Sequence, residues 1–365
     1  MIFTTAGSEL LHGRNPYGVD WNYGGLWFYS PICGWFFGLL SLLPSKVGLV
    51  AFNCGSHLIL VEGFRRFLRL FPRIPQENAF LSSLIILSTG ELIGAYQSVK
   101  LEMAMIGVML IVADQISRRP VHAAVWGAML INFKWFPLAP IGLLAVSNLR
   151  QGKYKFSLLL PVFLMVWFVL PVLFYGWQFT LELYRVQNST LDQFVSQVFN
   201  DFPSVFGMLK HTFGISLLNS AVSTIMGTAA FLLAGLIWFA PYEKDSQRLL
   251  AMSFGTLYVV NFNLLSQFNA YVIATPALAY ILFLAFASQG WRRYLSVFSV
   301  SAYWIIVSMF FSDLVPHSFR DLCRELRIKP LGSLVVLVVL MGFVLCDILR
   351  KWVKDIPNCQ SVAKA

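Results

Sequence analysis

Residues 332–349 have the sequence GSLVVLVVLMGFVLCDIL, eighteen residues with a single charged side chain, Asp347. A segment of this length and polarity crosses the hydrocarbon core of a bilayer as one α-helix. The whole chain shares the bias, because 58% of its 365 residues are hydrophobic, 12% are charged and the mean hydropathy is +0.69. A soluble domain carries roughly a quarter charged residues. The sequence therefore excludes a water-soluble fold and predicts an all-α polytopic membrane protein.

Similar apolar stretches recur along the chain, and one of them is interrupted. The stretch 121–148 contains Lys134 and Pro137 near its middle, so we expect a broken hairpin that enters and leaves on one side. With it, we expect a bundle of about 9–11 transmembrane helices in a single domain covering residues 1–365. Besides 332–349, the expected spans lie near residues 46–63, 78–95, 99–116, 157–176, 215–239, 250–266, 269–288 and 294–311.

Basic side chains set the expected orientation. Sixteen of the 27 Lys and Arg residues fall in six clusters between apolar stretches, which the positive-inside bias places in the cytoplasm. Most of the net charge of +10 is thereby explained by topology, and no nucleic-acid partner is expected. The clusters are Arg65–Arg73, Arg118–Arg119, Arg150–Lys155, Lys244–Arg248, Arg292–Arg293 and Arg350–Lys354.

Two outer loops follow from this orientation. Residues 1–45 form the first, and within it LWFYSPICGWFFGLLSLL at 26–43 is expected to lie along the interface because it is dense in aromatic residues. A plain span fits its composition equally well, but would place the arginines of 65–73 outside. The second large outer loop is 177–214. Apolar residues at helical spacing there predict an amphipathic helix on the membrane surface: Phe194, Val198, Phe202 and Phe206.

Charged residues in or beside the spans are the first candidates for function. Lys134, at the break of the hairpin, suits a phosphate or a carboxylate, although a lysine extending to the interface is the alternative. Glu91 and Glu102 flank an outer turn that also carries Gln97 and Lys100. These groups suit acid–base chemistry and phosphate binding, or a solvated turn with local ion pairs.

The outer loops add further polar candidates. The turn-rich segment before 26–43 carries Arg14, Tyr17 and Asp20, which suit either a lid over a substrate headgroup or an aromatic belt. Lys210 in the second loop is a candidate phosphate contact. Residues 312–331 are unusually basic for an outer loop, which an anionic lipid or a polyprenyl phosphate as partner would explain.

Several of these stretches, in this order, resemble glycosyltransferase family 87, a branch of the GT-C superfamily. The resemblance extends over nearly the whole chain and agrees with the predicted topology. The stretches that carry it are LLHGRNPYG at 10–18, FYSP at 28–31, AYQSVKLEMAM at 95–105, the hairpin with its K-x-x-P sequence within 118–140, NDFPSVFGMLK at 200–210 and LLSQFNAYVIATPAL at 264–278.

The resemblance implies a membrane-embedded hexosyltransferase. It would transfer a sugar, with mannose expected, from a polyprenyl-phosphate donor to a lipid or glycan acceptor, and the surrounding membrane lipids would be further partners. It implies a bacterial inner membrane with the active site on the periplasmic side, and inverting chemistry in which a carboxylate takes the acceptor's proton while cations stabilise the leaving phosphate. No cofactor or metal is expected, and the five cysteines lack C-x-x-C spacing.

Site residues follow from the same resemblance. We expect Lys134, with Lys210 and Arg14 behind it, to bind the donor phosphate, and we expect Tyr17, Gln97 and Asn269 to contact substrate. The family's catalytic aspartate follows its first transmembrane helix and would fall at or before Met1, so we expect both to be missing from this sequence. Within the given chain, Asp20 or Glu91 would then act as the base. Family histidines correspond to Gln267–Asn269, so their roles do not transfer.

Two other classes of function remain open from the sequence. A transporter or flippase for a lipid-linked sugar would share the basic residues and the broken hairpin, but it should show two related halves, and the sequence shows no internal repeat. A catalytically inactive, truncated homologue would account for the missing aspartate.

Overall fold

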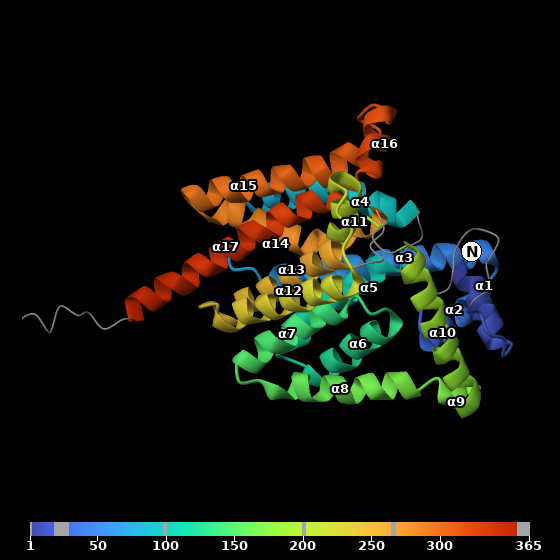
Figure 1. The fold of residues 1–365 in the computed structure, drawn as a ribbon. Helices are drawn as coiled ribbons and strands as arrows, with labels where there is room; N and C mark the ends of the chain where they lie inside the picture. Colours follow the sequence, from blue (N-terminus) through green and yellow to red (C-terminus); the bar gives the residue numbers. More distant parts are fainter. Residues whose placement is uncertain (1, 18–28, 98–100, 199–201, 264–267, 356–365) are drawn as a thin grey trace, which may run out of the picture.

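The chain forms a bundle of helices in the computed structural model, which describes residues 2–17, 29–97, 101–198, 202–263 and 268–355 (Figure 1). Within these ranges there is no β-strand. Seven helical segments are long and apolar enough to cross a membrane. This confirms the predicted all-α polytopic membrane protein. Their principal helices are α3 (Ser45–Phe67), α4 (Glu77–Gln97), α8 (Tyr154–Val169), α12 (Asn219–Phe239), α14 (Thr275–Ala287), α15 (Trp291–Tyr303) and α17 (Lys329–Asp355).

Two expected spans, 99–116 and 250–266, differ from this group. They correspond to α5 (Glu102–Gln115), which has only 14 residues, and α13 (Lys244–Phe262), which has 19 residues and a polar first turn. Neither is among the seven apolar spans. Both are buried among other helices: α5 packs against α3, and α13 packs against α7 (Leu138–Arg150) and α14. They form the centre of the bundle, where neighbouring helices replace lipid.

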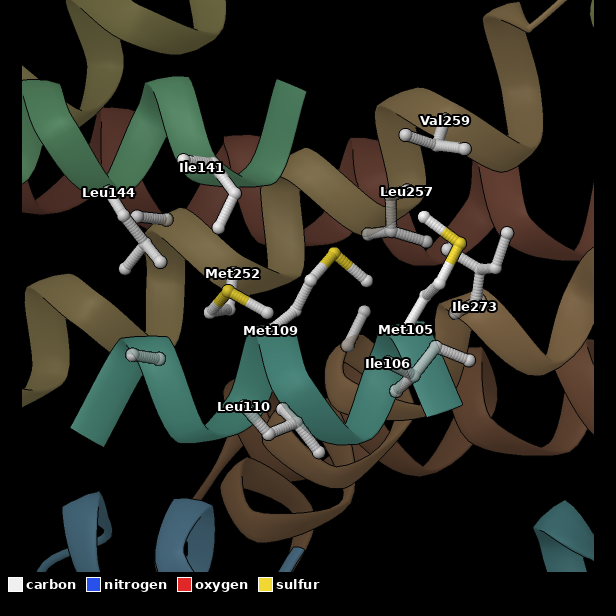
Figure 2. Close-up of a cluster of buried hydrophobic side chains, with 14 of the residues drawn as sticks. Met105, Ile106, Met109, Leu110, Ile141, Leu144, Met252, Leu257, Val259 and Ile273 are labelled. Atoms are coloured by element: carbon white, nitrogen blue, oxygen red, sulfur yellow. The ribbon is translucent and has the colours of Figure 1, made fainter. Parts of the chain in front are cut away.

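The central helices share one apolar core. Figure 2 shows Met105 and Met109 of α5 directed toward Met252 and Leu257 of α13, and all four side chains are at most 1% exposed. Ile141 and Leu144 of α7 are also fully buried in the same cluster. Unbranched methionines fill irregular gaps between helices well. The core therefore fixes α5, α7 and α13 as one unit.

Glycines permit close helix contacts at two crossings, one between α3 and α5 and one between α13 and α7. A Cβ on Gly63 of α3 would lie 2.4 Å from the carbonyl oxygen of Gly107 in α5, and one on Gly255 of α13 would lie 2.2 Å from the Cα of Pro140 in α7. Real Cβ atoms do not approach other atoms this closely. Small residues allow such crossings in membrane bundles, where van der Waals packing drives association.

The interrupted stretch 121–148 forms two short helices. α6 (Pro120–Phe133) ends just before Lys134, and α7 begins just after Pro137. Gly127 of α6 lies against Ile141 of α7, so the chain turns back on itself at the break. The structure thus contains the hairpin that the Lys134–Pro137 interruption predicts.

Shorter helices gather at one end of the bundle. α1 (Ile2–Leu11) packs against α2 (Pro31–Ser41), which has 11 residues and is too short to cross a membrane. The 177–214 loop contains α10 (Trp177–Val198) and α11 (Val205–Phe213). In Figure 1, α10 and α11 run across the direction of the long helices. α16 (His317–Glu325) lies at the same end.

Candidate active site

Lys134 lies at the turn between α6 and α7, in extended backbone after the last residue of α6. Its ammonium donates a hydrogen bond of 2.7 Å to Oε1 of Glu102, the first residue of α5. The Lys134 side chain is 31% exposed and the Glu102 side chain 6%. The pair therefore has a buried anionic side and a cationic side that a ligand can reach.

Two aromatic rings flank the Lys134 ammonium. Its Nζ lies 5.1 Å from the ring centroid of Tyr29 and 5.7 Å from that of Phe136. Aromatic faces attract cations at such distances. The Tyr17 hydroxyl donates a hydrogen bond of 2.6 Å to the carbonyl oxygen of Tyr29, which ties the N-terminal segment to this site. Glu102 of α5, the two aromatic rings and the N-terminal segment together hold the ammonium in one place.

A second lysine–glutamate pair lies at the same end of the bundle. Nζ of Lys329, the first residue of α17, lies 2.9 Å from Oε1 of Glu91 in α4. The rings of Tyr271 and Phe311 flank this ammonium at 5.0 and 5.2 Å. The Glu91 and Lys329 side chains are only 7% and 4% exposed. This pair repeats the arrangement around Lys134, but it is closed to solvent.

The closed pair connects distant segments. Tyr271 belongs to the short helix η2 (Phe268–Ala274), and its hydroxyl donates a 3.0 Å hydrogen bond to the carbonyl oxygen of Pro203, just before α11. Tyr303 of α15 donates to the carbonyl oxygen of Tyr271. Breaking one partner of a buried ion pair leaves an uncompensated charge. We therefore interpret the Glu91–Lys329 pair as a structural brace beside the more open Lys134 site.

Comparison with known protein families decides the identity of the chain. The sequence model of Glycosyltransferase family 87 matches residues 27–266, well over half of the 365 residues. The chain belongs to glycosyltransferase family 87. This family 87 protein is accordingly an integral membrane glycosyltransferase, which takes a sugar donor and an acceptor. The match includes Tyr29, Glu91, Glu102 and Lys134, whereas Lys329 lies beyond it. No curated protein and no solved structure matches the chain.

The remaining sequence candidates are spread over the same end. Arg14 is exposed and pairs with Glu9 at 2.5 Å, and Lys210 lies in the last turn of α11. Gln97 ends α4 and Asn269 lies in η2, but their side chains fall outside the described residues, as does the whole of Asp20. Of the predicted donor-phosphate residues, only Lys134 is in the cluster with Glu102 and Tyr29.

Sequence reasoning missed two pairings. Glu102 was a candidate functional residue beside an outer turn, but nothing in the sequence linked it to Lys134, which is 32 residues away. Lys329 belonged to the basic segment 312–331, yet its partner Glu91 is 238 residues away. Each partner was visible as a charged residue at the end of an apolar stretch. Their pairing depends on tertiary packing, which spacing along the chain does not encode.

Proposed function

We propose that this glycosyltransferase transfers a hexose, with mannose as the expected sugar, from a polyprenyl-phosphate donor to a lipid or glycan acceptor on the outer, periplasmic side of a bacterial inner membrane. The observation that supports this most is the half-open Lys134–Glu102 pair at the turn of the hairpin. A lysine there offers a compact cation to the donor phosphate, close to the end of the bundle where a lipid-linked substrate enters.

Lys134 is proposed to stabilise the leaving phosphate. As the acceptor hydroxyl attacks the anomeric carbon, the bond from that carbon to the phosphate oxygen breaks and its electron pair goes to the phosphate. A cation fixed beside that oxygen lowers the barrier, because it is already oriented when the charge develops. The surrounding rings and Glu102 hold Lys134 in position for this role.

Glu102 is proposed as a positioning residue for Lys134. In an inverting transfer, the acceptor and the leaving phosphate lie on opposite faces of the anomeric carbon, so the base stands away from the phosphate-binding cation. A carboxylate 2.7 Å from that cation is badly placed to take the acceptor's proton. Because Glu91 is enclosed in its own ion pair, Asp20 remains our candidate base. Tyr17, Gln97 and Asn269 remain proposed substrate contacts, and Lys210 and Arg14 secondary phosphate contacts.

The donor class can be tested with the purified chain in lipid nanodiscs. Labelled mannose is supplied either on a polyprenyl phosphate or on a nucleotide diphosphate, together with membrane-extracted acceptors, and the glycosylated product is quantified. We expect product from the polyprenyl-phosphate donor alone. Product from the nucleotide sugar alone would contradict the proposal. So would movement of the lipid-linked sugar across proteoliposomes without any transfer, which would indicate a transporter.

A further inference from the structure

A cavity at the opposite end of the bundle holds a second set of polar groups. Its lining includes Asp347 of α17, which is 18 residues beyond Lys329 on the same helix and thus about 27 Å along the helix axis. The cavity has a volume of about 150 Å³, well above the roughly 10–15 Å³ that one water molecule needs on the same measure. It is separate from the candidate active site.

An arginine in this cavity has an unused hydrogen-bond donor. Arg292 of α15 binds both carboxylate oxygens of Asp347 through its two terminal nitrogens, and the Tyr242 hydroxyl donates to the same carboxylate at 2.8 Å. The negative charge of Asp347 is therefore compensated. The Nε of Arg292 is buried, and among the described residues it has no hydrogen-bond partner. A buried donor without an acceptor is costly unless a ligand or water satisfies it.

The first turn of α13 adds further donors beside the same cavity. Glu243, at the N-cap of α13, makes no side-chain hydrogen bond to the helix, and no other side chain within the described residues is seen to cap the N–H groups of the first turn. Ser246 in that turn and Ser288 both line the cavity, and neither hydroxyl has a hydrogen-bond partner within the described residues. Helix N-termini favour anions through their exposed N–H groups and the helix dipole.

The surroundings of this helix end are positively charged. The ammonium of Lys153, next to Lys244, lowers the pKa of Lys244 to about 8. Asp245, in the same turn, is paired with Arg248 at 3.1 Å. Two exposed arginines lie near the lining residues in sequence. Arg73 directly follows Pro72, and Arg350 lies about one helical turn after Asp347 in α17. An anion at the cavity thus meets more cations than anions, because the one carboxylate of this helix end without an ion pair among the described residues is the exposed side chain of Glu243.

We propose that this cavity binds the phosphate group of an anionic membrane phospholipid. The phosphate oxygens accept hydrogen bonds from Nε of Arg292, from the hydroxyls of Ser246 and Ser288, and from the N–H groups in the first turn of α13. Most of the remaining lining is apolar, with Phe283, Phe343 and Val344 among its residues, and suits the acyl portion of a lipid rather than a free anion. Basic pockets between transmembrane helices bind lipid headgroups in this way.

The proposal is tested by lipid binding to the purified full chain in detergent, without donor or acceptor. Native mass spectrometry compares the binding of phosphatidylglycerol with that of phosphatidylcholine carrying the same acyl chains. We expect the anionic lipid to bind about tenfold more tightly, because one charge-assisted hydrogen bond contributes about that much affinity. Arg292→Lys keeps the charge beside Asp347 but removes Nε, and should abolish this preference. Arg293→Lys, at the neighbouring position that does not line the cavity, should retain it.

Further arms separate the site from misfolding and from other ligands. Ser246→Ala, which leaves the Arg292–Asp347 pair intact, should also weaken phosphatidylglycerol binding, and Lys134→Ala should not. Equal binding of the two lipids, or unchanged binding by both Arg292→Lys and Ser246→Ala, would overturn the proposal. It would equally be overturned if inorganic phosphate alone raised the unfolding temperature as much as phosphatidylglycerol, because the ligand would then be a free anion.

Discussion

At the scale of single residues, the account depends on how Lys134 is held. The sequence placed a lysine at a helix break, and the structure adds a carboxylate at 2.7 Å and two aromatic rings around the same ammonium. Such a cation is oriented before substrate arrives. The phosphate of the proposed donor would then approach from the exposed side, while Glu102 keeps its place on the buried side.

Replacing Glu102 by Gln tests the positioning role. The amide retains the size of the side chain but no longer stabilises the charged form of Lys134, so we expect sugar transfer to fall about tenfold, with the larger loss at alkaline pH. Measuring kcat and KM for the donor between pH 6 and pH 10 checks this. A uniform loss at every pH, with Glu102→Asp failing to restore activity, would indicate a merely structural role.

At the scale of elements, the sequence predicted the spans and the hairpin better than their burial. The basic clusters and the Lys134–Pro137 interruption together predicted the hairpin, and the same clusters, with the aromatic residues of 26–43, predicted that this segment does not cross the membrane; the structure has only the 11-residue α2 there. Apolar length did not distinguish α5 and α13, whose apolar residues face other helices instead of lipid. Nor did it give the Glu91–Lys329 pair, because partners 238 residues apart in sequence meet only in the folded bundle.

The Glu91–Lys329 brace predicts a strong coupling energy between its two residues. Each single replacement, Glu91→Gln or Lys329→Met, leaves one buried charge without its partner and should lower the free energy of unfolding by about 3–5 kcal/mol. The double variant should lose clearly less than the sum of the two single variants. Unfolding in mixed detergent micelles gives the double-mutant cycle, and additive losses would show that the two groups do not stabilise one another.

The α7–α13 crossing predicts a sharp dependence on the absence of a side chain. Gly255→Ala would place a methyl group 2.2 Å from the Cα of Pro140 and should destabilise the protein by about 1–3 kcal/mol through forced helix separation. Gly235→Ala in α12 is the matched control, because no atom lies within 4 Å of its Cβ position. Thermal unfolding of the two variants should differ, and equal stability would contradict the close crossing.

At the scale of the whole molecule, the two ends of the bundle carry two different proposed sites. One end gathers the short crossing helices, both lysine–glutamate pairs and the proposed transfer site, and the other carries the cavity at Arg292. The basic clusters predict that these ends face opposite sides of the membrane, with the transfer site outside.

Cysteine labelling tests that orientation. In a cysteine-free background, Leu314→Cys near α16 and Trp352→Cys near the end of α17 both introduce exposed thiols. A membrane-impermeant maleimide should label position 314 in intact cells and position 352 only after permeabilisation. The reverse pattern would place the Lys134 site in the cytoplasm and refute the outer-face assignment.

The most direct measurement of the central claim is sugar transfer by Lys134→Ala in nanodiscs. Because the leaving phosphate would lose its fixed cation, we predict a loss of about 10²–10³-fold in kcat with the polyprenyl-phosphate donor, partly restored in Lys134→Arg. Lys155→Ala, an exposed lysine in the first turn of α8, should remain fully active. Full activity of a folded Lys134→Ala protein would contradict the account.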